Sequence, residues 1–200
     1  MLHYPYQNFY EAIESNAKNE PNKTAIFIEK RKITYLKLKQ DIDTFARFLE
    51  FSGIKHGDKV AMIVSNSEEF VVALFAITKI GAVAVPLNTF LKKEEFEYIL
   101  NDCDARLLVC SAAYAAETKD LLKTTKIEKI VWTDKYEHLD EQNYSFTEID
   151  MAQETHERLM KSPTLDALAC IVYTSGTTGK PKGAMLSYRN IFSNSVGAVE

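Results

Sequence analysis

Short apolar runs alternate with amphipathic stretches over most of the chain, and this alternation limits the fold more than any other feature. The apolar segment at residues 70–87 illustrates it. Lys79 and Gly81 interrupt this segment, so it does not read as one continuous membrane-spanning helix. It divides into a helix over about residues 68–80, ended by Gly81, and a buried strand at residues 82–85. The segment therefore predicts a βαβ element with both faces of its sheet covered.

The same pattern extends in both directions from this segment. A charged turn separates two short β-branched runs near the N-terminus, which predicts a hairpin. The helix that follows has Thr34 as its expected N-cap, apolar residues at spacings of four, three and four, and Gly53 as its stop. Besides the elements at 68–85, we expect strands at 24–29, 31–34, 59–64, 106–110 and 129–133, and helices after Thr34, over 92–101 and over 112–123.

Strands that alternate with helices predict an α/β fold with a doubly wound, mostly parallel sheet and flanking helices. We expect one incomplete domain in three parts. Residues 1–133 form βα units, residues 134–163 form an irregular acidic connection, and residues 164–200 form a strand, a loop and a helix. Ligands of such sheets bind at the carboxyl ends of the strands, which is where the loop after residue 172 is expected to lie.

Composition and charge exclude several classes of function. The 200 residues are 46% hydrophobic and 26% charged, which is ordinary for a globular protein with a core. Lys and Arg number 24 against 28 Asp and Glu, giving a net charge of −4. This balance gives no sign of a surface for nucleic acid or anionic membranes. Any phosphate ligand must therefore be held locally.

Cysteine usage and the N-terminus suggest the compartment. Cys103, Cys110 and Cys170 are far apart, and each lies in or beside an apolar run, so we expect buried, reduced thiols. The four histidines lack the spacing of metal ligands, and no zinc site is expected. Residues 1–6 have no basic stretch followed by an apolar one, so no secretory signal is expected. We therefore expect a cytoplasmic protein without a transmembrane segment.

The segment from Tyr173 to Gly183 has the composition of a phosphate-binding loop. It contains three glycines, three threonines, one serine and two lysines, and it follows the apolar run at 168–172. Glycines let backbone N–H groups approach an anion, hydroxyls add neutral donors and lysines add positive charge. A flexible linker can have a similar composition, but Pro181 and the flanking apolar runs favour a fixed loop.

This loop is not the P-loop of nucleotide triphosphatases. That motif has two glycines separated by four residues and followed by Lys-Ser/Thr. Here Pro181 follows Gly179 and Lys180, and Thr174 stands where the first glycine would be. The main sequence evidence for a kinase or a GTPase is therefore missing from this segment.

The order Thr-Ser-Gly-Thr-Thr-Gly-Lys-Pro-Lys-Gly from Thr174 to Gly183 instead resembles the phosphate-binding signature of the adenylate-forming superfamily, which includes the acyl-CoA synthetases. The chain departs from this family at Tyr188, where relatives often have histidine. The ending Pro-Leu-Asn at residues 86–88 is more similar to fatty-acyl and aryl-acid ligases than to peptide synthetase domains. Further blocks similar to acyl-CoA synthetases lie, in the family's order, at residues 34–38, 57–61, 66–70 and 79–88.

The resemblance implies a two-step reaction. A carboxylate attacks the α-phosphate of ATP, which gives an acyl-adenylate and pyrophosphate, and the thiol of CoA then displaces AMP. The loop would bind the β- and γ-phosphates, whose charge grows as pyrophosphate leaves. By resemblance, Thr174 helps to hold Mg²⁺, and Lys182 neutralises the phosphates together with Lys180, for which a solvated turn lysine is an equal alternative. The phosphate-binding residues implied are Thr174, Ser175, Gly176, Thr177, Thr178, Gly179, Lys180 and Lys182.

Family members are several hundred residues long, so we expect this chain to be an N-terminal portion. Alone it should lack catalytic residues and activity, and its exposed apolar surface should favour self-association or a homodimer. The resemblance implies ATP, Mg²⁺ and CoA for the full-length enzyme, and a small carboxylate, expected to be a fatty acid, as its substrate. The alternative is a non-catalytic nucleotide-binding or interaction module.

Overall fold

The computed structural model describes residues 6–28, 30–118, 120–149, 162–174 and 179–197. The N-terminal half contains α1 (Phe9–Asn19), β1 (Thr24–Ile28), β2 (Arg31–Thr34), α2 (Tyr35–Phe51), β3 (Lys59–Ile63), α3 (Glu68–Lys79), β4 (Val83–Pro86) and α4 (Lys93–Asp102). The remainder contains β5 (Ala105–Cys110), η1 (Ala112–Tyr114), α5 (Ala115–Thr118), α6 (Leu121–Thr124), β6 (Lys129–Trp132), β7 (Asn143–Ser145), η2 (Phe146–Glu148), β8 (Leu168–Thr174), β9 (Lys182–Ser187) and α7 (Tyr188–Gly197).

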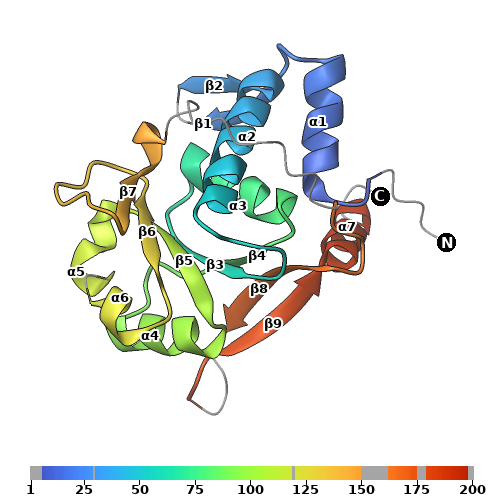
Figure 1. Ribbon diagram of the computed structural model, residues 1–200. Helices are drawn as coiled ribbons and strands as arrows, with labels where there is room; N and C mark the ends of the chain where they lie inside the picture. The colour runs from blue at the N-terminus through green and yellow to red at the C-terminus, as the bar shows by residue number, and fades with distance from the viewer. Residues whose placement is uncertain (1–5, 29, 119, 150–161, 175–178, 198–200) are drawn as a thin grey trace.

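Seven of the described strands form one sheet, in the order β7-β6-β5-β3-β4-β8-β9. Neighbouring strands are parallel throughout, except for the antiparallel pair β8 and β9. The strands β1 and β2 form a separate antiparallel hairpin, as the sequence predicted. The expected α/β fold with a mostly parallel sheet is thereby confirmed (Figure 1).

Each face of the sheet has its own hydrophobic core, because successive residues of a strand point to opposite faces. In β3, Val60 and Met62 pack into the core that α2 and α3 cover, while Ala61 and Ile63 pack into the core that α4 covers. Figure 1 shows α1, α2 and α3 on one side of the sheet and α4 on the other. Burial on both faces explains why these strands are apolar at consecutive positions instead of alternating ones.

The helix boundaries follow local chemistry that the sequence shows. The hydroxyls of Thr34 and Ser67 accept N-cap hydrogen bonds at the starts of α2 and α3. Beyond their ends, Gly53 and Gly81 have φ angles of +84° and +72°, in the left-handed region that favours glycine. A Cβ atom at Gly81 would lie 2.4 Å from the His56 ring, so this glycine is also required by close packing.

Two parts of the chain differ from the sequence prediction. The single helix expected over residues 112–123 is wrong, because η1, α5 and α6 divide this stretch into short pieces. Asp120 lies between α5 and α6 and forms an ion pair of 2.6 Å with Lys93 of α4, and aspartate is a poor residue for a helix interior. The strands β7 and β9 were not predicted, since each depends on a neighbouring strand for its pairing.

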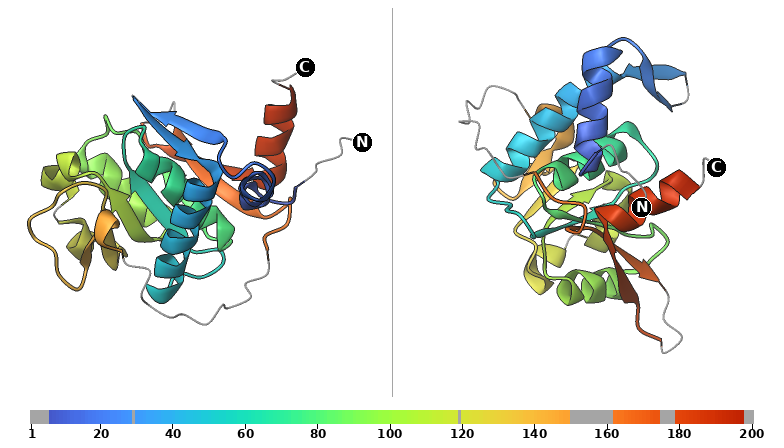
Figure 2. Two further views of the ribbon diagram at one scale, coloured as in Figure 1. Left: turned by 90° about the horizontal axis from the view of Figure 1, so that it is seen from above. Right: turned by 90° about the vertical axis from the view of Figure 1, so that its right-hand side faces the viewer.

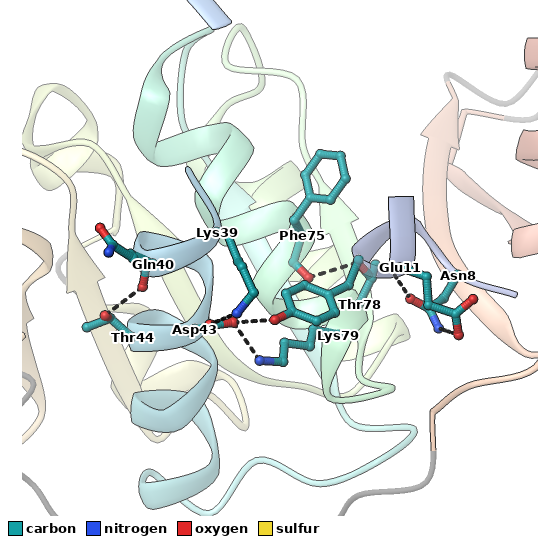
Figure 3. A network of polar contacts seen from close by, with 10 residues as sticks. Asn8, Glu11, Lys39, Gln40, Asp43, Thr44, Phe75, Thr78 and Lys79 are labelled. Carbon is teal, nitrogen blue, oxygen red and sulfur yellow. Dashed lines mark hydrogen bonds and ion pairs between the residues drawn. The ribbon is translucent and has the colours of Figure 1, made fainter. Parts of the chain in front are cut away.

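Helices α1, α2 and α3 are joined by a polar network around Asp43. Its carboxylate accepts hydrogen bonds from Lys39, Lys79 and the hydroxyl of Tyr10, each at 2.7 Å. The ammonium group of Lys79 also lies 4.2 Å from the centre of the Tyr10 ring. Figure 3 shows the two lysines pointing toward Asp43 from α2 and α3. One carboxylate thus ties three helices together on this face of the sheet.

The start of α1 packs against α7, which comes from the other end of the chain (Figure 2). The ring of Phe9 lies 4.9 Å from that of Tyr188 and 5.2 Å from that of Phe192, measured between ring centres. Aromatic pairs in this range stabilise beyond their buried area. The segment after β9 is therefore fixed to the rest of the domain.

The cysteines are free and buried, as the sequence predicted. Burial raises the pKa of Cys103 and of Cys170 to about 11, and that of Cys110 to about 12. Thiols with such pKa values are protonated at neutral pH and are poor nucleophiles.

Within the described ranges, no helix has both the length and the apolar character needed to cross a bilayer.

Candidate phosphate-binding site

The predicted phosphate loop connects the two strands of a hairpin. Thr174 ends β8 and is paired with Lys182, which begins β9. Both ends of the loop are thereby brought together by the antiparallel ladder. Of the predicted site residues, Thr174, Gly179, Lys180 and Lys182 are described and exposed. The other four, Ser175, Gly176, Thr177 and Thr178, lie outside the described residues, and their phosphate contacts stay a prediction.

Glycine is required at two positions of the hairpin, and the structural reason differs between them. Gly179 has a φ angle of +88°, a conformation that side chains disfavour, although no atom would obstruct a Cβ there. A Cβ atom at Gly183 would lie 2.7 Å from Cγ2 of Ile171 and 3.1 Å from Cζ of Tyr173. Gly183 thus lets the Tyr173 ring lie across the opposite strand. The backbone conformation therefore favours glycine at position 179, and close packing requires glycine at position 183.

The two lysines of the loop occupy different positions. The ammonium group of Lys180 lies 5.4 Å from the centre of the Tyr98 ring on α4, within the range of a cation–π contact. Lys182 lies on β9, and its side chain is exposed opposite Thr174. Lys180 therefore lies beside an aromatic ring, a contact that neither of the two predictions for this lysine included.

The hairpin lies at a different edge of the sheet from the one that the sequence predicted. Strand β8 is paired with β4 at a single position, Ala84 with Cys170, and then runs toward α4 (Figure 1). The hydroxyl of Tyr173 donates a hydrogen bond of 2.6 Å to Oδ2 of Asp102, the last residue of α4. The described ends of the loop thus lie beside α4 and near the start of β5, which Asp102 adjoins, and the expected position among the carboxyl ends of the parallel strands is wrong for these ends.

The chemistry of the hairpin fits a polyphosphate. The stretch from Tyr173 to Ser187 contains two lysines and no acidic residue. Exposed positive charge and glycine-rich backbone are the groups that hold phosphate oxygens. The described residues contain no group of three or more His, Cys, Asp or Glu side chains that could hold a metal ion. The hydroxyl of Thr174 is exposed at the end of β8, and its role toward Mg²⁺ stays a prediction.

Sequence reasoning missed the contacts that hold the hairpin. Tyr98 and Asp102 lie four residues apart on α4, so they share one helix face, but nothing in the sequence says what covers that face. Tyr173 was read only as the start of the motif. An acidic residue in the last turn of a helix interacts unfavourably with the helix dipole. The position of Asp102 in the last turn of α4 was therefore a sign in the sequence that this carboxylate has a partner outside the helix.

These features define an α/β protein in which a hairpin with a basic, glycine-rich loop forms one edge of a mostly parallel sheet. Residues 13–199 match the AMP-binding enzyme family, and the chain therefore belongs to that family. The 2-succinylbenzoate–CoA ligases of Bacillus cereus and Bacillus thuringiensis are each 33% identical to it over 178 residues, which are 89% of this chain and 32% of the ligase. The chain thus spans about a third of the length of the curated relatives it matches.

Solved structures agree with this placement. An anthranilate CoA ligase, crystallised with anthranoyl-AMP, matches with a TM-score of 0.83 and 31% identity, over 94% of this chain and 36% of that one. A putative long-chain-fatty-acid CoA ligase from Rhodopseudomonas palustris matches with a TM-score of 0.82 over 96% of this chain and 48% of that one. Its identity is 21%, so it supports the fold alone.

Proposed function

We propose that the full-length protein is an ATP-dependent carboxylate–CoA ligase that works through an acyl-adenylate. Membership of the AMP-binding enzyme family is the observation that carries this proposal. The relatives that are at least 30% identical are CoA ligases by name. The reaction consumes ATP, a carboxylic acid and CoA, and it releases AMP and pyrophosphate. The basic hairpin supports the proposal because its charge suits the triphosphate of ATP.

In this proposal the hairpin loop serves the adenylation step. As the carboxylate attacks the α-phosphate, the bond to the β-phosphate breaks and negative charge grows on the leaving pyrophosphate. Lys182 and backbone N–H groups beside Gly179 would stabilise that charge more in the transition state than in the ground state. Thr174 would supply a hydroxyl near Mg²⁺, which adds positive charge when bound. Binding energy directed at the leaving group accelerates this step and leaves the later thioester step unaffected.

For the substrate, the relatives favour an aromatic carboxylic acid over a fatty acid. The names of the more similar proteins specify 2-succinylbenzoate and anthranilate. A fatty acid is the second candidate, supported by a long-chain-fatty-acid–CoA ligase from Archaeoglobus fulgidus that is 25% identical and has a TM-score of 0.77. We therefore propose a small carboxylic acid, and we rank aryl acids before fatty acids.

Exchange of labelled pyrophosphate into ATP tests the proposal, because it depends on reversible adenylation. The full-length protein would be assayed with 2-succinylbenzoate, anthranilate, benzoate and fatty acids of increasing length. We expect exchange with at least one acid, and stronger exchange with an aryl acid. Exchange with none of these acids would overturn the proposal and favour a non-catalytic nucleotide-binding or interaction module. Stronger exchange with fatty acids would reverse our ranking of substrates.

For the 200-residue chain alone, we propose that it neither completes the reaction nor stays monomeric. The hairpin exposes 67% of Met185 and 36% of Val172, and β9 is an edge strand of the described sheet. Exposed strand edges with apolar side chains promote pairing between chains. Light scattering should show dimers or larger species of this chain, and a monodisperse monomer would contradict this.

We also propose a cytoplasmic location, which the three buried free thiols support.

A further inference from the structure

Helix α4 contacts both ends of the hairpin loop. Before the loop, the hydroxyl of Tyr173 donates a hydrogen bond of 2.6 Å to Asp102. After the loop, the ammonium group of Lys180 lies 5.4 Å from the centre of the Tyr98 ring. In the sequence, these two contacts lie on either side of residues 175–178. The loop therefore enters and leaves beside the same helix.

The two contacting residues of α4 form a distinct face of that helix. Tyr98 and Asp102 are one turn apart, so their side chains project in the same direction. The apolar residues Phe96, Ile99 and Leu100 are fully buried against the sheet. The helix thus uses one side for the core and presents an aromatic ring and a carboxylate to the hairpin.

Asp102 has no favourable role within its own helix. It ends α4, where the exposed carbonyl groups already carry partial negative charge, and no basic residue lies in this last turn. The hydrogen bond from Tyr173 gives the carboxylate a donor that the helix itself does not provide. A contact between α4 and the hairpin explains why an acid is useful at this position.

Tyr173 is suited to a fixed contact. Its ring packs at the edge of the core that α4 covers, and Gly183 on the opposite strand leaves room for it. Burial, and then the hydrogen bond to Asp102, raise the pKa of the Tyr173 hydroxyl above its ordinary value. The hydroxyl therefore keeps its proton and stays a donor at physiological pH.

We propose that Tyr173 and Lys180 are positioning residues, which fix the two ends of the phosphate loop on α4 through Asp102 and Tyr98. This inference rests on the proposed function of the loop, and it assigns different roles to the two lysines. Lys180 holds the loop through the Tyr98 ring, and Lys182 is left to meet the phosphates of ATP. A loop whose two ends are already held loses less conformational freedom when it binds ATP.

Conservative and disruptive variants of the full-length protein test the proposal in matched pairs. Asp102→Asn keeps an acceptor for Tyr173 and Asp102→Ala removes it, while Tyr98→Phe keeps the ring face and Tyr98→Leu removes it. In pyrophosphate exchange, Asp102→Ala and Tyr173→Phe should raise the KM for ATP about fivefold, the effect of one lost hydrogen bond. Tyr98→Leu should raise it about two- to fivefold, as for an exposed cation–π contact. Asp102→Asn and Tyr98→Phe should stay near the wild-type value.

The KM for the carboxylic acid separates positioning from a general loss of structure. We expect it to be unchanged in all variants, since only the phosphate loop moves. An unchanged KM for ATP in Tyr173→Phe, Asp102→Ala and Tyr98→Leu would overturn the proposal. Equal increases in both KM values would overturn it as well, because the contacts would then serve general stability.

Hydrogen exchange keeps this inference separate from the proposed function. If the wild-type protein catalyses no exchange with any acid, the ligase proposal fails, yet the anchoring of the hairpin can still be measured. The amides of residues 182–187 should exchange faster in Asp102→Ala than in Asp102→Asn, because β9 loses its support. Equal exchange rates in these two variants would show that Asp102 does not hold the hairpin.

Discussion

The hydroxyl of Tyr188 donates a hydrogen bond of 2.7 Å to the carbonyl oxygen of Thr78, which joins residues 110 positions apart. Tyr188 begins α7 and is fully buried, and Thr78 lies in the last turn of α3. The same carbonyl also accepts a hydrogen bond of 3.1 Å from the backbone of Gly81. Tyr188 thus has a structural role in this chain.

We expect Tyr188→Phe to lower the free energy of unfolding by about 1 kcal/mol, since it removes one hydrogen bond while Gly81 still satisfies the carbonyl. Tyr188→Ala should cost about 3–5 kcal/mol, because it also leaves a cavity beside Phe9. Urea denaturation measures both. The control is Tyr114→Phe, whose hydroxyl has a long contact of 3.4 Å to Ser65 and which should change stability by less than about 0.5 kcal/mol. A neutral Tyr188→Phe would contradict the role of the bond.

The network around Asp43 gives a second prediction. Asp43→Asn removes the charge that Lys39 and Lys79 share and leaves two ammonium groups close together (Figure 3). We expect a loss of about 2 kcal/mol, as for hydrogen bonds to a charged group. Asp41→Asn is the matched control, because its partner Lys37 is 60% exposed and surface ion pairs contribute about 0–1 kcal/mol. Equal losses in the two variants would mean that the network adds nothing beyond a surface pair.

The same carboxylate predicts a dependence of stability on pH. Burial alone would raise the pKa of Asp43, but hydrogen bonds from Lys39, Lys79 and Tyr10 outweigh it, and the pKa lies below its ordinary value. A lowered pKa stabilises the folded state above the pKa of the unfolded chain, and this stability is lost as the pH falls through the folded pKa. Wild-type stability should therefore fall more steeply in acid than that of Asp43→Asn, as urea titrations at several pH values would show. If the stability of both proteins changed with pH in the same way, the lowered pKa of Asp43 would be contradicted.

The sequence predicted the fold where structure is decided locally. The cap Thr34, the stops Gly53 and Gly81, and the apolar runs that both faces of a sheet require are visible without knowledge of neighbouring elements. The strand β9 was missed because its stretch lacks a strand period and forms by pairing with β8. The segment β7 is three residues long and depends on β6 in the same way.

The candidate site shows the same limit. The composition of the loop is local, and it pointed to phosphate from the sequence alone. The surroundings of the loop are not local, since Tyr173 and Asp102 are 71 positions apart. The expected place at the carboxyl ends of the strands followed a rule for regular sheets, which β8 leaves after one paired position. Divergence of a single strand is a property of packing, and no residue pattern announces it.

Gly183→Ala should destabilise the hairpin. The added Cβ would come within 2.7 Å of Cγ2 of Ile171, so that side chain must shift, and within 3.1 Å of Cζ of Tyr173, so the ring must give way slightly. Overpacking of this kind costs about 1–3 kcal/mol, which urea denaturation would reveal. The neighbouring Ala184→Ser adds an atom at an exposed position and should change stability by less than about 0.5 kcal/mol. A stable Gly183→Ala variant would show that the hairpin adjusts without cost.

The two lysines of the loop should differ in the chemical step they affect. In the full-length protein, Lys182→Ala should slow adenylation about 10²-fold, because it removes charge that stabilises the leaving pyrophosphate. Lys180→Ala should slow it about fivefold or less, since its ammonium group meets the Tyr98 ring. Thioester formation from supplied acyl-adenylate needs no pyrophosphate contact, so both variants should keep the wild-type rate in that half-reaction. Equal losses of Lys182→Ala in both half-reactions would show that the loop does not act on the leaving group, and a greater loss in Lys180→Ala would exchange the roles of the two lysines.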